Sequence, residues 1–399
     1  MASAGKTRRT LIIVENLPSP FDRRVWQEAT TLKEGGYVVT IVCPTGPGYE
    51  RHFEVIDDIH IYRYRLPFEA DGVVGYLIEY VWALLAQFFL AIRVYLTRGF
   101  DVIHACNPPD NIFLVALPFK LFGVRFLFDH HDINPELYEA KFGRRGFFYG
   151  LMLAFERWTF RCSDVSIATN ESYRRIAVRR GGMDPRRVFV VRSGPDLTRL
   201  QITMPNRERK HGRRYLVGYV GVMGKQEGID LLLEAIGYIV GQRGRIDIHF
   251  CLVGGGTELG ALVALSAKLG VADYVTFTGR VSDADLLDVL NSADICVNPD
   301  RANAMNDMST MNKIMEYMAL AKPIVQFDLA EGRFSAQGAS LYAKRNDPVD
   351  FGDKILELLG DETRRKAMGD LGRSRVQREL AWEFEAPKLI AAYDALFGS

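Results

Sequence analysis

The nonapeptide FDHHDINPE, at residues 128–136, places two adjacent histidines between two aspartates directly after an apolar run. Imidazole and carboxylate groups in such a cluster are able to bind a metal or to perform acid–base chemistry. On an extended segment, however, His130 and His131 point in opposite directions, and the chain has no distant His or Cys cluster to complete a tetrahedral set. We therefore predict no metal here, with one histidine facing a cleft and the other facing inward; a purely structural turn is the alternative.

Two glycine-rich stretches in the second half of the chain, YVGVMGK at 219–225 and LVGGG at 252–256, each follow an apolar run and precede a helical pattern. Glycines leave backbone N–H groups open to an anion, and the N-terminus of the next helix adds its positive end. We select Gly221, Lys225 and Gly255 as candidate phosphate ligands, with tight turns that bind nothing as the alternative. A nicotinamide site is disfavoured, because no acidic residue ends a following strand at the expected distance.

The stretch NDMSTMNKIMEYMALAKPIV, at residues 306–325, predicts a helix that begins near Ser309 as its N-cap. Asn312 and Lys313 then lie near the start of the helix, and Lys313 and Glu316 share one helical face. A lysine beside a helix N-terminus suits a diphosphate, and a carboxylate one turn later suits the vicinal hydroxyls of a ribose. In isolation, the same two residues also fit a solvated helix face.

The elements that position these candidates alternate between short apolar runs and helical patterns, which is typical of βαβ units and parallel sheets. The alternation stops at the basic stretch QITMPNRERKHGRR and then starts afresh. We therefore predict an α/β protein with a first domain over 1–200, a linker over 201–214, a second domain over 215–380 and a final helix over 381–399 that crosses back to the first domain. Ligands of such sheets bind beyond the carboxyl ends of the strands.

The composition is that of a soluble globular protein, with 48% hydrophobic residues, 25% charged residues and a net charge of +1 that gives no general attraction to nucleic acid. Five scattered cysteines without a CxxC pair, and an apolar N-terminal run too short for a signal peptide, predict a cytoplasmic protein. Nothing in the sequence indicates an oligomeric state.

Two apolar segments, 73–96 and 146–160, lie near basic residues, which suits peripheral contact with the anionic inner face of the cytoplasmic membrane. The alternative is that both segments are buried helices. The uncharged part of the first segment has only 13 residues, whereas about 20 are needed to span a bilayer.

Several of these stretches together resemble the retaining glycosyltransferases of the GT-B fold, family 4, and in particular a bacterial surface-polysaccharide branch. The resemblance rests on YVGVMGKQEGIDLLLEA, LVGGGTELGALVALSAKLGVADYVTFTGRVSDADLLDVLNSADICVNP and NKIMEYMALAKPIV, and less specifically on SPFDRRVWQEATTLKEGGYVVTIVCP and FDHHDINPE. It covers residues 10–395 and implies two doubly wound Rossmann-like domains that face each other across a cleft. In such enzymes the second domain holds a nucleotide diphosphate sugar and the first binds the acceptor.

For the donor, the resemblance implies that Glu316 holds the ribose. The residues it places near the base are Thr278, Gly279, Arg280 and Val281. The family's other carboxylate, eight residues before Glu316, falls on Met308, and we take the adjacent Asp307 as a catalytic candidate in its place. The family's arginine and lysine of the first glycine loop fall on Val222 and Glu227. This leaves Lys225 and Lys313 to neutralise the diphosphate.

In the first domain, the resemblance aligns His131 with the family's cleft histidine, and His130 is the fallback in case the register shifts by one residue. The strand ends of this domain are expected to line the acceptor side, where the candidate ligands are Arg23, Arg24, Asn107, Asp110 and Asp132. The two arginines suit an acceptor phosphate, such as that of a lipid-linked diphosphate. Their alternative is pairing with nearby acids at the start of a helix.

The resemblance therefore implies a retaining transferase that moves a sugar to a glycan, lipid-linked or small-molecule acceptor during surface polysaccharide or glycoconjugate assembly. A metal cofactor is not predicted, because the one DxD match, at 283–285, fits a helix start capped by Ser282. A sugar-nucleotide epimerase of similar fold is one alternative. A non-catalytic nucleotide-sugar or lipid-binding protein is another, and Met308 in place of the family carboxylate keeps it open.

Overall fold

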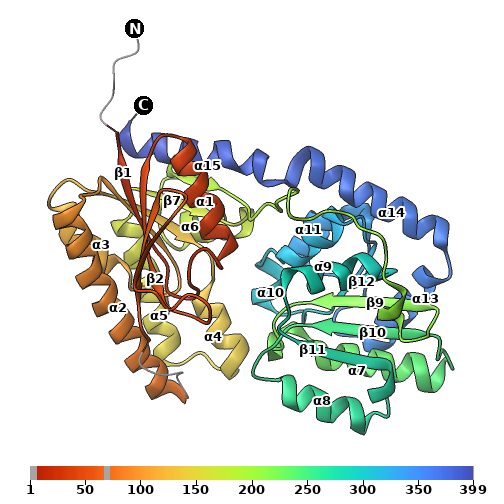
Figure 1. Cartoon of the computed structure of the whole chain (residues 1–399). Helices are drawn as coiled ribbons and strands as arrows, with labels where there is room; N and C mark the ends of the chain where they lie inside the picture. The colour runs from red at the N-terminus through yellow and green to blue at the C-terminus, as the bar shows by residue number, and fades with distance from the viewer. Residues whose placement is uncertain (1–6, 67–71, 399) are drawn as a thin grey trace. The chain divides into compact units, whose positions relative to one another are not determined.

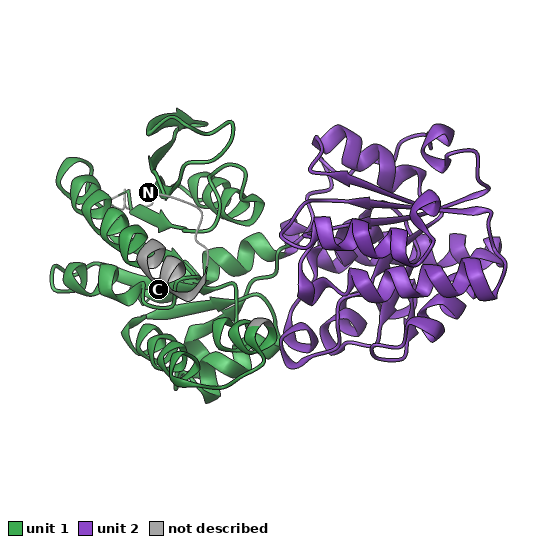
Figure 2. Cartoon of the chain, turned by 90° about the horizontal axis from the view of Figure 1, so that it is seen from below, with its two compact units in different colours: residues 1–193, 385–399 green, residues 194–384 purple. Residues whose placement is uncertain are grey.

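The computed structural model describes residues 7–66 and 72–398, except the side chains of residues 72–80 and 141. The chain divides into two compact units (Figure 2), residues 1–193 with 385–399 and residues 194–384. The boundary differs from the predicted linker over 201–214, because that stretch packs within the second unit. There Arg209 pairs with Asp288 at 2.7 Å, and Lys210 pairs with Asp294 at 2.8 Å.

The first unit is built on an eight-stranded sheet in the order β3-β4-β2-β1-β5-β6-β7-β8. All neighbouring strands are parallel except β3 and β4. The strands are β1 (Arg9–Ile13), β2 (Val38–Pro44), β3 (Phe53–Ile56), β4 (Ile59–Tyr64), β5 (Val102–Cys106), β6 (Arg125–His130), β7 (Val165–Ala168) and β8 (Val188–Val190). The strand order reverses between β1 and β5, and ligands of doubly wound sheets bind at such a point.

The helices that flank this sheet (Figure 1) are α1 (Arg23–Glu34), α2 (Gly72–Thr97), α3 (Phe113–Lys120), α4 (Asn134–Phe142), α5 (Phe147–Cys162), α6 (Glu171–Arg179) and α15 (Trp382–Phe397). Asp22 caps α1 by accepting a hydrogen bond from the Val25 N–H at 3.1 Å. From Glu385 onward, α15 belongs to the first unit. Its Tyr393 is buried there, with its hydroxyl 2.9 Å from Thr10 Oγ1. Among the described residues, no helix is both long and apolar enough to cross a membrane.

The second unit is built on a six-stranded, wholly parallel sheet in the order β11-β10-β9-β12-β13-β14. Its strands are β9 (Tyr215–Val220), β10 (Ile248–Val253), β11 (Val275–Gly279), β12 (Ile295–Asn298), β13 (Ile324–Phe327) and β14 (Ser340–Ala343). Its helices are α7 (Ile229–Gly237), α8 (Leu259–Lys268), α9 (Asp283–Ser292), α10 (Ala304–Met308), α11 (Asn312–Ala319), α12 (Ala330–Ala336), α13 (Pro348–Leu359) and α14 (Glu362–Arg375). The strand order reverses between β9 and β12, which places the loops after these strands at the expected ligand edge.

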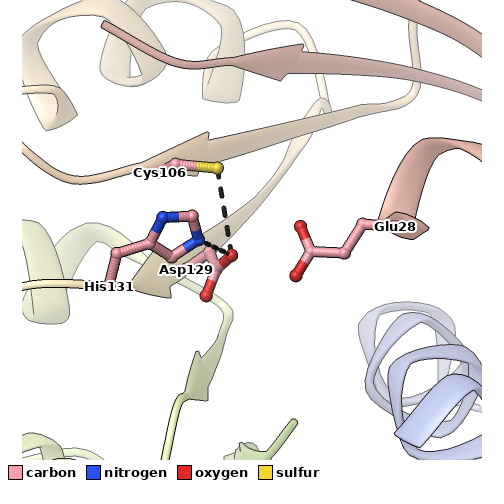
Figure 3. Close-up of side chains that lie close together, drawn as sticks. All are labelled: Glu28, Cys106, Asp129 and His131. Carbon is pink, nitrogen blue, oxygen red and sulfur yellow. Dashed lines mark hydrogen bonds and ion pairs between the residues drawn. The ribbon is translucent and has the colours of Figure 1, made fainter. Parts of the chain in front are cut away.

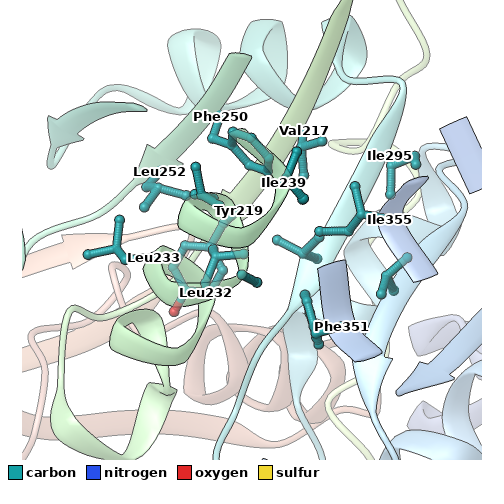
Figure 4. Packing of buried hydrophobic residues seen from close by; sticks show 14 of the residues in the cluster. Val217, Tyr219, Leu232, Leu233, Ile239, Phe250, Leu252, Ile295, Phe351 and Ile355 are labelled. Carbon is teal, nitrogen blue, oxygen red and sulfur yellow. The ribbon is translucent and has the colours of Figure 1, made fainter. Parts of the chain in front are cut away.

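One hydrophobic cluster of the second unit lies between its sheet and the helices α7 and α13 (Figure 4), and a second cluster includes residues of α9 and α11. Val217 of β9 and Phe250 of β10 are fully buried, as are Leu232 of α7 and Phe351 and Ile355 of α13. Burying each such side chain contributes about 1.5–3 kcal/mol. These two parallel sheets with their helices confirm the predicted pair of doubly wound, Rossmann-like domains.

Candidate active site

Arg24, at the start of α1, is 7% exposed and makes all its described contacts inside the first unit. Its Nη2 donates to Asp129 Oδ1 at 2.9 Å, and its Nη1 donates to the Val191 carbonyl at 2.9 Å and to Ser193 Oγ at 3.2 Å. The prediction that Arg24 grips an acceptor phosphate is therefore wrong, because its guanidinium holds the end of β6 to the chain after β8. Arg23, the next candidate, is exposed.

The two histidines at the end of β6, the last strand residue His130 and the next residue His131, face opposite ways, as a strand end requires. His131 is 16% exposed, and its ring contacts Asp129 Oδ2 through Nε2. His130 is fully buried, with its ring packed against Phe160 and Tyr173 at centroid distances of 5.1 Å each. This burial lowers the pKa of His130 to about 3. Of the two, His131 is therefore the one with an exposed side chain.

Figure 3 shows a cluster that the sequence did not predict, formed by Glu28, Cys106, Asp129 and His131, whose ligand-type atoms all lie within 4.8 Å of one another. Arg24 Nε lies 3.1 Å from Glu28 Oε1, 3.1 Å from Asp129 Oδ2 and 2.9 Å from His131 Nε2. A guanidinium thus already occupies the position of a cation among these groups, and its charge would repel a metal ion. Burial also raises the pKa of the Cys106 thiol well above its ordinary value, whereas a metal needs the thiolate. These residues fit an internal guanidinium better than a metal.

Asn107, just after β5, fixes the backbone beside His131. Its Oδ1 accepts hydrogen bonds from the N–H groups of His131 at 2.6 Å and Asp132 at 3.1 Å, and its Nδ2 donates to Asp110 Oδ1 at 2.7 Å. Asn107 and Asp110 are buried, and burial raises the pKa of Asp110 to about 7. Of the predicted acceptor ligands at these strand ends, Asp132 is half-buried, whereas Asn107 is buried and binds the backbone of the loop after β6.

In the second unit, the two glycine loops interlock at the carboxyl ends of β9 and β10. The N–H of Gly221 donates to the Val253 carbonyl at 3.0 Å, and the N–H of Met223 donates to the Gly255 carbonyl at 3.0 Å. A Cβ atom on Gly254, whose φ is +136°, would lie 1.8 Å from the Gly221 carbonyl oxygen, so a side chain there is impossible. The expectation that the Gly221 N–H is open to an anion is therefore wrong, because the loops use it to bind each other.

Lys313 is the second residue of α11, whose N-cap is Met311 rather than the predicted Ser309. Its Nζ lies 2.6 Å from Glu227 Oε2 and 3.0 Å from Asp300 Oδ1, and it would be 3.2 Å from a Cβ atom on Gly221. The ammonium group thus lies beneath the first glycine loop, between two carboxyl groups. Burial raises the pKa of Asp300 to about 7. The sequence did not identify Asp300 as part of this site.

Glu316, one turn further along α11, accepts a hydrogen bond from Arg199 at 2.6 Å, and Arg199 also reaches Asp283 Oδ2 at 3.2 Å. Arg199 was not predicted, because it follows the first unit directly and lies 117 residues from Glu316 along the chain. Asp307, a predicted catalytic residue, instead accepts the Ala330 N–H at 2.9 Å and pairs with Arg345 at 2.8 Å. Its carboxylate thereby caps α12.

The remaining donor candidates lie at the same edge of the second sheet. Thr278 and Gly279 are half-buried at the end of β11, and Arg280 and Val281 are exposed just beyond it. Lys225 is exposed at the start of a short 3-10 turn, and Asn312 is exposed at the start of α11. The positive charges exposed at this edge therefore include Lys225 and Arg280.

Two family descriptions match the chain and together span both units. Residues 22–194 match "Glycosyl transferase 4-like domain", and residues 214–361 match "Glycosyl transferases group 1". Among curated proteins, the D-inositol 3-phosphate glycosyltransferase of Geodermatophilus obscurus is 27% identical over 249 residues, which cover 58% of this chain and 53% of that protein. The chain spans about half the length of the curated relatives it matches.

Solved structures resemble the whole chain. Sucrose-phosphate synthase from Thermosynechococcus elongatus superposes with a TM-score of 0.80 at 18% identity, covering 98% of this chain and 99% of that one. Anabaena HepE in complex with UDP-glucose superposes with a TM-score of 0.73 at 14% identity, covering 97% and 99%. At these identities the likeness concerns the fold.

Proposed function

The chain belongs to the family 4 glycosyltransferases of the GT-B fold, and from this membership we propose that it moves a sugar from a nucleotide diphosphate sugar to an acceptor hydroxyl. The observation that carries the proposal is the edge of the second sheet, where two interlocked glycine loops meet Lys313 and Glu316. Glu316 would accept hydrogen bonds from ribose hydroxyls, and the exposed Lys225 would help to neutralise the diphosphate.

The transfer we propose retains the sugar's configuration. The bond from the anomeric carbon to the phosphate oxygen breaks, the acceptor oxygen forms its bond on the same face, and the departing phosphate takes the acceptor's proton. The developing negative charge is stabilised by cations and backbone dipoles in this proposal rather than by a metal, so EDTA is expected to leave the rate unchanged. His131 would contact the reacting sugar from the first unit.

The test is a panel of UDP-, GDP- and dTDP-sugars followed by thermal stability. We expect one nucleotide class to raise the melting temperature, and nucleotide release to depend on an added acceptor. If no nucleotide sugar shifts the melting temperature, the donor site is refuted. Conversion of the donor without any acceptor would instead identify an epimerase.

We further propose that the face formed by α2 and α3 rests on an anionic membrane during surface polysaccharide or glycoconjugate assembly. Large apolar side chains are exposed on α2, on α3 and on the two residues that follow Lys120, the last residue of α3. They are Val81, Trp82, Leu85, Phe89, Leu96, Leu114, Leu117, Leu121 and Phe122. Arg93 and Arg125 are exposed near them. Residues 73–80 of the predicted apolar segment lie outside the described side chains. A basic, apolar face of this kind suits an anionic bilayer surface.

Vesicle co-sedimentation tests this membrane contact. Phosphatidylglycerol vesicles are expected to bind the wild-type chain more strongly than phosphatidylcholine vesicles, and the double variant Phe89→Glu, Leu121→Glu should lose that binding. Leu371→Glu, which changes an exposed leucine of α14, is the matched control. Equal binding of the double variant and the control would refute the assignment of this face.

A further inference from the structure

Glu28, one turn after Arg24 on α1, is a fully buried carboxyl group. Among the described residues, neither of its oxygens has a hydrogen-bond partner. Its closest basic groups are Arg24 Nε at 3.1 Å and His104 Nε2 at 3.6 Å. An ionised carboxylate in such a place would carry a large desolvation cost with few donors to offset it.

Asp129, the other carboxyl group of the cluster, is much better supplied with donors. Arg24 donates to both of its oxygens, the Cys106 thiol donates to Oδ2 at 3.9 Å, and His104 Nε2 lies 3.6 Å from the same oxygen. The cluster thus contains two buried carboxyl groups and one guanidinium. The negative charge that balances Arg24 belongs on Asp129, because that is where the hydrogen-bond donors are.

The other titratable groups around Glu28 supply no second positive charge. His104 of β5 lies with Nδ1 3.1 Å from the hydroxyl of Tyr393 on α15, and burial lowers its pKa, so it is neutral. Cys106 keeps its thiol proton, and Asp22, at the N-cap of α1, contributes further negative charge. His131 is the remaining imidazole of the cluster, and its side chain is 16% exposed.

We infer that Glu28 is a positioning residue that holds a proton, and that as a neutral acid it leaves Arg24 and Asp129 to orient the His131 ring. This inference rests on the proposed function, in which His131 meets the reacting sugar. The reason is geometric: Arg24 Nε carries one hydrogen and lies 2.9 Å from His131 Nε2 and 3.1 Å from both Glu28 Oε1 and Asp129 Oδ2. An ionised Glu28 would compete with His131 for that hydrogen.

The electrostatics of the two carboxyl groups agree with this assignment. Burial raises the pKa of Glu28 well above its usual range, although Arg24 opposes the shift. Burial acts in the same direction on Asp129, but Arg24 and His131 outweigh it and hold the pKa of that carboxyl well below its usual range.

The first test uses stability and needs no substrate. A neutral Glu28 takes up a proton when the chain folds, so wild-type stability must fall as the pH rises from the unfolded pKa of about 4.3 toward the raised folded value. In Glu28→Gln this dependence disappears, so the ratio of wild-type to variant unfolding constants should rise by up to about tenfold per pH unit between the unfolded pKa and the raised folded pKa. Glu34→Gln, an exposed change on the same helix, is the matched control and should show no such trend.

Tryptophan fluorescence during denaturation reports mainly on the first unit, since Trp26, Trp82 and Trp158 lie there and Trp382 alone does not. A constant or decreasing ratio of unfolding constants would show that Glu28 is ionised and overturn the inference. If Glu28→Gln does not fold, wild-type chain with ¹³C-labelled glutamate gives the same answer, because the carboxyl carbon shift separates an acid from a carboxylate.

The second test uses the pH dependence of turnover. The kcat of Glu28→Gln, taken relative to its own value at pH 7, should lack the alkaline loss that wild type shows as Glu28 ionises. A tenfold drop at pH 7 with an unchanged pH profile would mean that the carboxylate form is required. If no nucleotide sugar binds at all, the proposed function fails, while the stability test of Glu28 stays valid.

Discussion

Replacing Asp300 by asparagine should make donor binding insensitive to pH. Asp300 is 1% exposed, and with Glu227 it flanks the Lys313 ammonium beneath the first glycine loop. With Asp300 protonated, Glu227 and Lys313 balance each other and the site is neutral. With Asp300 ionised, the site carries a net negative charge that repels an incoming diphosphate.

The size of the effect follows from the pKa of Asp300, which burial raises to about 7. At pH 8 only about one molecule in eleven retains the proton, so the dissociation constant of the donor should be about tenfold larger than at pH 6. This ratio corresponds to about 1.4 kcal/mol. Binding above pH 7 should also take up close to one proton per nucleotide sugar. In Asp300→Asn the affinity should be nearly equal at the two pH values.

Isothermal titration in buffers of different ionisation enthalpy measures both the affinity and the proton uptake. Nucleotide sugars are the right ligands, because their diphosphate is esterified at both ends and lacks the second ionisation near pH 6 of a terminal phosphate. Asp273→Asn, which alters an exposed aspartate of the same unit, is the control and should behave like wild type. A wild-type affinity that does not change with pH, without proton uptake, would refute this account of the Lys313 site.

Four further substitutions separate binding, turnover and stability. Glu316→Ala should weaken nucleotide binding by at least tenfold, since a hydrogen bond to a charged group contributes about 1.5–3 kcal/mol. An unchanged affinity in a titration would show that Glu316 does not bind the ribose. His131→Ala should lower turnover while leaving nucleotide affinity near normal, whereas His130→Ala should mainly lower the stability of the first unit. Steady-state kinetics and chemical denaturation of both variants test this. A loss of turnover in His130→Ala but not in His131→Ala would show that the two histidines have been assigned the wrong way round. Arg24→Met should destabilise the first unit by about 3–5 kcal/mol, because it leaves Asp129 buried without its partner; a loss below 1 kcal/mol in chemical denaturation would contradict the internal role of the guanidinium.

Local patterns were sufficient to predict the architecture. Strands such as β9 and β10 are buried on both faces and appear in the sequence as mostly apolar runs, which together with the intervening helical patterns indicate parallel sheets. The opposite orientations of His130 and His131 also follow from a local rule, the alternation of side chains along a strand.

The partners of the candidate residues were not predictable in the same way. Arg24 and Asp129 are separated by 105 residues, and Arg199 and Glu316 by 117. No periodicity in the sequence links such pairs. Arg24 was expected to bind a ligand and Arg199 was not predicted, and in the structure each pairs with a carboxylate of its own unit. The interlocking of the glycine loops was hidden for the same reason, since a glycine pattern shows where backbones approach closely but not what they approach.

The structure of the chain in complex with a nucleotide sugar tests the central claim most directly. The account predicts the ribose hydroxyls at Glu316 and the diphosphate above the loop that contains Gly221 and Lys225. A nucleotide bound elsewhere, or at this edge without contact to Glu316, would contradict it.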